Sequence, residues 1–156
     1  MAEILLNDSF GKAIYSTIRD YKFTSCLEIG SFNGDGSTQV LIAALSRASN
    51  PKLVCLESNP ERFKKLIRNT KDYPWVKNIC NSTISLASLT ISDFDHDIWQ
   101  SCFNKLQFSY EQVSSWWKQD IEFLKNIESG YLESNDESFD VCLIDGGEFC
   151  RTMNLG

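Results

Sequence analysis

The stretch Leu27-Glu28-Ile29-Gly30-Ser31-Phe32-Asn33-Gly34-Asp35-Gly36-Ser37-Thr38 leaves a short apolar run, turns through a series of glycines and enters a helical pattern. Glycines at these places let the backbone turn sharply, and they let a ligand approach with no Cβ in the way. The start of the following helix offers free amide donors and the positive end of the helix dipole. Residues 28–38 are therefore expected to form a loop that binds a polar ligand at the tip of a strand.

Short apolar runs alternate with helical patterns on both sides of this loop. Strands are expected over 25–29, 53–57, 76–80 and 139–145, and helices over 8–21, 38–49, 111–128 and from Pro60 onward. Strands that are apolar on both faces are typical of a parallel sheet covered by helices on its two sides. The fold class is therefore α/β, with a mostly parallel sheet in a three-layer sandwich. Residues 1–156 are expected to form a single domain.

Two of the expected helices carry an apolar stripe. In the first, Asp8 or Ser9 is the expected N-cap, and the inward face consists of Phe10, Ile14, Ile18 and Tyr21.

The segment 81–138 is longer than one crossover connection needs. We interpret 111–128 within it as the crossover helix and 85–109 as an insertion or lid. The inward stripe of 111–128 consists of Trp116, Ile121, Leu124 and Ile127.

Composition and charge exclude several classes of protein. The net charge is -6, from 15 basic and 21 acidic side chains. Such a surface repels phosphate backbones, so no nucleic-acid partner is expected. The basic run 62–68 has helical spacing and is interpreted as a solvated helix face. The sequence shows neither a membrane-spanning run nor a signal peptide, so no membrane partner and a cytoplasmic location are expected.

The cysteines show no CxxC spacing, and one histidine accompanies them. A zinc site and a disulfide framework are therefore not expected. Four cysteines fall in or beside the expected strands and are interpreted as small buried apolar residues: Cys26, Cys55, Cys80 and Cys142. The acidic group Asp93, Asp95, His96 and Asp97 could supply oxygen ligands to a metal, but it matches no calcium loop. An exposed acidic loop is the preferred interpretation.

The spacing of the glycine loop is E-x-G-x-x-x-G-x-G. Gln39 stands where the third glycine of a dinucleotide motif would fall, which disfavours a nucleotide-dependent oxidoreductase. The spacing resembles the first motif of the S-adenosylmethionine-dependent methyltransferases of Rossmann-like fold (class I), over roughly residues 8–148. The resemblance implies S-adenosylmethionine as the cofactor, with Glu28 helping to hold its methionine amino group.

Further along the chain, Glu57 is expected at the tip of the second strand. A carboxylate there can accept hydrogen bonds from both ribose hydroxyls. The resemblance implies adenine contacts after the third strand. The expected cofactor-binding residues are Glu28, Gly30, Ser31, Phe32, Asn33, Gly34, Gly36, Ser37, Thr38, Glu57, Ser58, Asn81, Ser82, Thr83, Asp145 and Gly146.

The segment 139–148 resembles the F-D-x-x-x-I-D-G stretch that ends strand four in small-molecule O-methyltransferases, including those that act on sugars of natural products. The resemblance implies methyl transfer to a hydroxyl of a small molecule or sugar, with Asp145 facing the methyl end of the cofactor. Metal-dependent relatives bind magnesium at this carboxylate and continue with a polar pair such as Asp-His. Gly147-Glu148 stands there instead, so neither a metal ligand nor a catalytic base is assigned.

The family's strand order is 3-2-1-4, and its members continue with three more strands. A fold truncated after the fourth strand is therefore expected, with that strand at an open edge. Either a partner copy pairs there, or the segment 85–138 covers it, or the chain is a fragment, which we favour. The alternative function is a non-catalytic or fragmentary cofactor-binding or assembly module derived from a methyltransferase.

Overall fold

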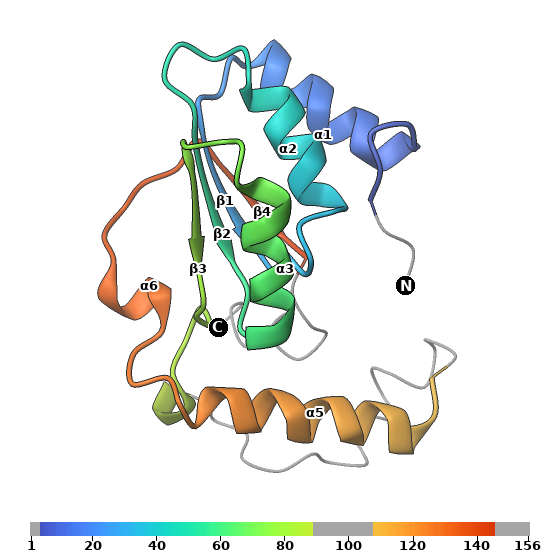
Figure 1. The fold of residues 1–156 in the computed structure, drawn as a ribbon, viewed down its shortest axis with the longest axis vertical. Coiled ribbons are helices and arrows are strands. Elements are labelled where there is room, and N and C mark those ends of the chain that lie inside the picture. Colours follow the sequence, from blue (N-terminus) through green and yellow to red (C-terminus); the bar gives the residue numbers. More distant parts are fainter. Residues whose placement is uncertain (1–3, 89–107, 146–156) are drawn as a thin grey trace.

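A computed structural model describes residues 4–88 and 108–145. Within them, four parallel strands form one sheet in the order β3-β2-β1-β4 (Figure 1). This confirms the expected α/β fold and strand order. The elements along the chain are α1 (Ser9–Asp20), β1 (Ser25–Ile29), α2 (Ser37–Leu45), β2 (Lys52–Leu56), α3 (Pro60–Thr70), β3 (Val76–Ile79), the short 3-10 helix η1 (Leu86–Ser88), α5 (Tyr110–Leu124), α6 (Tyr131–Ser134) and β4 (Val141–Ile144).

The helix starts follow the capping rules. Asp8 caps α1 by accepting a hydrogen bond from the Gly11 N–H at 2.6 Å. Asn59 caps α3 in the same way, with Pro60 in its first turn. In α1, however, Phe10 and Tyr21 are 55% and 72% exposed. These residues lie at the two ends of a helix that packs beside α2, so the expectation that they face inward is wrong.

The two faces of the sheet carry different parts of the core. One face presents Cys26, Leu53 and Cys55 to α1, α2 and α3, whose buried contributions are Ile18, Leu41, Ile42, Ala44, Leu45 and Leu66. The other face presents Leu27, Ile29, Val54 and Leu56, and Tyr131 of α6 packs against them. This alternation is the two-residue period of a strand. Both faces of β1 and β2 are therefore buried, as predicted for the centre of a parallel sheet.

The connection from β3 to β4 differs from the expected crossover. Figure 1 shows α5 beyond the carboxyl ends of the strands, whereas Tyr131 of α6 and Phe139 pack on the core of the sheet. The interpretation of 111–128 as the crossover helix is thus wrong. Val113 and Trp117 are the buried residues of α5, whereas Trp116 is half-buried. Residues 89–107 of the expected insertion, with the acidic group 93–97, lie outside the described residues.

Strand β4 lies at one edge of the sheet. Its Cys142 is exposed and Ile144 is 48% exposed. Cys80, just past the end of β3 at the opposite edge, is exposed as well. The expectation that these two cysteines are buried is wrong. Cys142 shares the exposed face of β4 with Ile144, whereas Val141 and Leu143 on the opposite face pack on the core. Cys26 and Cys55 on the central strands are buried as expected. In the described part of the chain, no helix is long and apolar enough to cross a membrane.

Candidate functional site

The loop between β1 and α2 requires glycine at two positions. Gly30 and Gly34 adopt φ angles of 84° and 75°, in the left-handed region that favours glycine. A Cβ on Gly34 would also lie 2.6 Å from Cδ1 of Leu66 on α3. The third glycine, Gly36, is the N-cap of α2. The glycine spacing in the sequence therefore corresponds to a tight turn pressed against α3.

Phe32 takes a left-handed conformation in this loop without being glycine, with a φ of 52°. Its N–H donates to Oε2 of Glu57 at 2.8 Å. The guanidinium carbon of Arg62 lies 4.6 Å from the centroid of its ring. Such a backbone conformation costs about 1–3 kcal/mol and persists where the surroundings over-determine it. Here a carboxylate and a cation from β2 and α3 provide that support.

Further hydrogen bonds fix the loop to its neighbours. The N–H groups of Gly30 and Ser31 both donate to the Leu56 carbonyl, each at 3.0 Å. Asn69 Nδ2 donates to the Asn33 carbonyl at 2.9 Å, and Gln39 Nε2 donates to the Gly34 carbonyl at 2.6 Å. The loop is thus held by hydrogen bonds to residues at the end of β2, in α2 and in α3.

Glu28 lies fully buried beneath the loop. Its Oε1 accepts a hydrogen bond from Ser37 Oγ and its Oε2 accepts one from Thr38 Oγ1, each at 2.6 Å. The carboxylate therefore holds the first turn of α2 in place. A contact between Glu28 and a methionine amino group stays a prediction.

Glu57 directly follows β2 and is 5% exposed. Besides the Phe32 N–H, it accepts a hydrogen bond at Oε1 from the Asn59 N–H at 2.8 Å. Burial raises the pKa of this carboxyl group above its ordinary value, while the Asn59 N–H and the charge of Arg62 act in the opposite direction. The carboxylate of Asp120 on α5 raises the pKa of Glu57 as well. This long-range effect agrees with the position of α5 beyond the strand tips in Figure 1.

The remaining predicted residues that the structure describes lie at the same edge. Ser58 is half-buried beside Glu57, and Asn81 to Thr83 follow β3, with Ser82 and Thr83 buried. The Glu57 N–H donates to the Ile79 carbonyl at 3.2 Å, which ties the tips of β2 and β3 together. Asp145 is exposed after β4, and its N–H donates to the Ile29 carbonyl at 2.8 Å. Gly146 lies outside the described residues.

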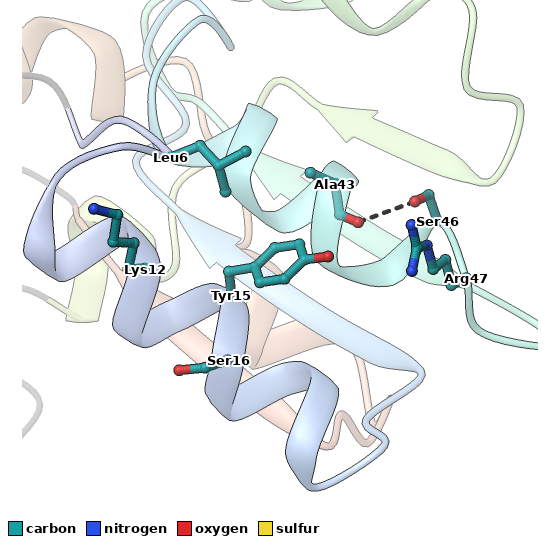
Figure 2. Close-up of a pocket in the computed structure, with 7 residues that line it drawn as sticks. All are labelled: Leu6, Lys12, Tyr15, Ser16, Ala43, Ser46 and Arg47. Atoms are coloured by element: carbon teal, nitrogen blue, oxygen red, sulfur yellow. Dashed lines mark hydrogen bonds between the residues drawn. The ribbon is translucent and has the colours of Figure 1, made fainter.

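Residues 4–88 and 108–145 contain no cluster of three His, Cys, Asp or Glu side chains that could hold a metal. A surface pocket of about 580 Å³ lies elsewhere, between α1 and α2 (Figure 2). Its lining, which contains none of the predicted site residues, consists of Leu6, Lys12, Tyr15, Ser16, Ala43, Ser46 and Arg47.

Sequence reasoning missed the residues that support the loop. The sequence places Arg62 in a basic run with the spacing of a solvated helix face, and Gln39 stands at the position of a glycine in the dinucleotide motif. The position of Arg62 in the first turn after Glu57 was the available signal, because a strand tip and the following helix start lie at the same edge. Asn69 gave no signal, since it comes 36 residues after its partner Asn33.

The chain resembles parts of several solved methyltransferases. The SAH-bound methyltransferase PaMTH1 of Podospora anserina shares 25% identity over 55% of this chain and 37% of its own, with a TM-score of 0.44. The N-methyltransferase NodS of Bradyrhizobium japonicum WM9 shares 14% identity over 58% of this chain and 48% of its own, with a TM-score of 0.36. A putative methyltransferase of Thermoplasma acidophilum shares 18% identity over 51% of this chain and 36% of its own, with a TM-score of 0.33.

No protein-family model matches the sequence, and no curated protein matches it either. The chain spans less than half the length of each of the three solved proteins. All three TM-scores are below 0.5, so these likenesses are partial. The described residues define a four-stranded Rossmann-like sheet with a glycine loop and a buried carboxylate at its carboxyl edge.

Proposed function

We propose that this chain binds S-adenosylmethionine across the carboxyl edge of its sheet, as the cofactor-binding part of a methyltransferase. The observation that carries the proposal is the pairing of the ordered glycine loop with the buried carboxylate of Glu57. The Phe32 N–H donates directly to that carboxylate, which brings the tips of β1 and β2 into one site. A ligand with an amino-acid end and a ribose fits this combination.

The residues present fit the chemistry of such a cofactor. Amide groups at the start of α2 suit a carboxylate on the ligand. Glu57 suits ribose hydroxyls because an ionised carboxylate only accepts hydrogen bonds and can accept two at once. The acidic side chains Asp120 and Asp145 add negative charge at the same edge, which suits a positively charged sulfonium. When bound, the cofactor would supply an electrophilic methyl group at that sulfonium.

The role of the chain is then to bind and orient the cofactor. The hydrogen bonds that hold the loop to its neighbours would lower the entropic cost of binding, because they restrict its conformations. For the acceptor, we propose a hydroxyl group of a small molecule or sugar, in accord with the F-D-x-x-x-I-D-G-like segment that ends at the tip of β4. The net charge of -6 argues against a nucleic-acid acceptor.

Calorimetry with S-adenosylhomocysteine tests this proposal. We expect the wild-type chain to bind, and we expect Glu57→Gln to raise the Kd about tenfold or more, because hydrogen bonds to a charged group contribute about 1.5–3 kcal/mol each. Glu61→Gln is the matched control, since Glu61 is exposed on the next turn and pairs with Lys64. Its Kd should equal that of the wild type. Absence of binding by the folded wild-type chain would refute the proposal.

A second candidate is a cofactor-binding or assembly module without turnover of its own. The exposed apolar edge of β4 favours it, because such an edge is a surface for pairing with another strand. The two candidates differ in one measurement. A chain that binds S-adenosylhomocysteine but releases none from S-adenosylmethionine with any hydroxyl acceptor tested would support the module.

A further inference from the structure

The segment that follows β3 is attached to a second segment far along the chain. The N–H groups of Tyr131 and Leu132 donate to the carbonyls of Ser82 and Thr83, at 2.8 and 3.1 Å. Asn81 Nδ2 donates to the Ser129 carbonyl at 3.2 Å. Two stretches about fifty residues apart thus lie side by side through backbone groups.

Glu133 closes this attachment. Its Oε1 accepts hydrogen bonds from the N–H and the hydroxyl of Ser85, at 3.0 and 3.1 Å, and from the hydroxyl of Ser88. Its Oε2 accepts from the N–H of Gly130 at 2.6 Å. These donors hold the pKa of Glu133 down to about 2, so the carboxylate is ionised at neutral pH. One side chain therefore joins the start of α6 to η1.

Gly130 allows the two backbones to approach this closely. A Cβ at this position would lie 2.3 Å from Cα of Ile84 and 2.4 Å from the carbonyl oxygen of Thr83. The φ angle of Gly130 is -68°, which any residue can adopt, so space rather than backbone conformation requires the glycine.

The attachment is in turn fixed to the sheet. Tyr131 is 2% exposed and packs on Leu27, Ile29, Val54 and Leu56. Its hydroxyl donates to Glu137 at 2.8 Å, and Glu137 forms an ion pair with Lys52 of β2 at 3.2 Å. The stretch Gly130–Glu133 is therefore a rigid support for the segment Asn81–Ser85.

The supported segment borders the proposed ligand site on one side. A ligand that places its amino-acid end at the β1 loop and its ribose at Glu57 extends next toward the tip of β3. The Glu57 N–H donates to the carbonyl of Ile79, the last residue of β3, at 3.2 Å, so the end of β3 lies beside the residue that carries this carboxylate. In accord with this, burial and the charge of Glu57 raise the pKa of Cys80. The base of an adenosine group would then lie against Asn81–Ser85.

From these contacts we infer that Gly130–Glu133 forms a clasp that holds Asn81–Ser85 against the base of the bound adenosine group, with Glu133 as a positioning residue. The inference rests on the proposed function. Glu133 touches no ligand in this arrangement, and it acts through Ser85 and the backbone of the supported segment.

The test compares two ligands by calorimetry. One is S-adenosylhomocysteine, and the other is S-ribosylhomocysteine, which keeps the ribose and the amino acid but lacks the base. For Glu133→Ala we expect the Kd of S-adenosylhomocysteine to rise about tenfold, because the supported segment loses its position. The Kd of S-ribosylhomocysteine should not change. A general loss of structure would weaken both ligands alike, so the ratio of the two Kd values is the diagnostic quantity.

Two further variants complete the test. Ser88→Ala removes a single donor to Glu133 and should raise the ratio of the S-adenosylhomocysteine Kd to the S-ribosylhomocysteine Kd by about threefold, in the same direction as Glu133→Ala, which decides the matter if Glu133→Ala does not fold. Glu128→Gln is the matched control on an exposed acid of the same connection, and its ratio should equal that of the wild type. If the wild-type chain binds and the ratio is unchanged in both clasp variants, the clasp inference is wrong. If the folded wild-type chain binds neither ligand, the proposed function itself is wrong, and the clasp inference falls with it.

Discussion

At the scale of single residues, the β1–α2 loop depends on backbone conformations that ordinary side chains rarely adopt. The glycine spacing predicted the turn, and the left-handed φ angles of Gly30 and Gly34 confirm it. The third left-handed residue, Phe32, could not be predicted, because its conformation depends on Glu57 and Arg62, which come later in the chain. Sequence patterns identify the residues that a turn needs within its own segment. They do not identify partners that are distant in the sequence and are brought close by folding.

Gly34 offers a test of this loop. We expect Gly34→Ala to lower the free energy of unfolding by about 1–3 kcal/mol, because the residue needs a positive φ and its new Cβ would meet Leu66. Urea denaturation measures the change. The neighbouring Asp35 is exposed, so Asp35→Ala serves as the control and should stay within about 0.5 kcal/mol of the wild type. Equal stability of Gly34→Ala and the wild type would show that the turn tolerates a side chain.

At the scale of elements, the sequence predicted which segments form helices and strands better than it predicted which elements pack against each other. The apolar pattern of α5 predicted a helix, and a helix is present, yet its docking position was predicted wrongly. An amphipathic stripe indicates that one face of a helix is buried, but it does not indicate which element packs against that face. The role of α6 was missed because a single turn has too few residues to show a period. The clasp at Glu133 was missed for the same reason.

Strand β4 is fastened to β1 by Asp140. Its Oδ2 accepts hydrogen bonds from the N–H groups of Thr24 and Ser25, at 2.8 and 2.9 Å, and from both hydroxyls, at 3.2 and 3.0 Å. These donors lower the pKa of Asp140. A lowered carboxyl pKa contributes stability that is fully present above the unfolded value of 3.8 and is lost as the pH falls through the folded value.

We therefore expect Asp140→Asn to unfold at a lower urea concentration than the wild type near neutral pH. The difference between the two midpoints should shrink as the pH falls below about 4, because the wild-type carboxylate is then protonated. Asp136→Asn, on the exposed loop before β4, is the control and should follow the wild type at every pH. A midpoint difference that is constant with pH would mean that the charge of Asp140 does not fasten the strand.

At the scale of the whole molecule, the strand order followed from the sequence through the resemblance, and the parallel sheet followed from the alternation of apolar runs with helices. The exposure of residues on the edge strand β4 could not be predicted from the sequence in this way. Cys142 and Ile144 look like core residues in the sequence, yet they lie on the exposed face of β4, whereas Val141 and Leu143 on its other face pack on the core. The site could be predicted as far as its strand tips, since parallel strands bring their carboxyl ends together.

The open edge of β4 leads to a prediction about association. Light scattering after size exclusion should show the wild-type chain shifting toward dimers as its concentration rises. Within residues 4–88 and 108–145, β4 pairs with a strand on one side only, and an edge strand is a template for another strand. We expect Ile144→Lys to restore the monomer, since a charge on the edge strand opposes pairing. Leu132→Lys is the control, because Leu132 on α6 is also 48% exposed but lies away from the edge. A wild-type chain that stays monomeric at every concentration would contradict an interface at β4.

The pairing of β4 with β1 also has a consequence for the time course of synthesis. Ser25 and Asp140 are 115 residues apart, so the ribosome needs roughly 6 to 23 seconds between making one and making the other. During that interval β2 can already pair with β1 on its other edge, and β3 can pair with β2. The backbone groups of β1 that later pair with β4 have no strand partner during this time. The edge of β1 that pairs with β2 is thus hydrogen-bonded first. A chaperone that holds emerging chains would bind the other edge of β1, which later pairs with β4.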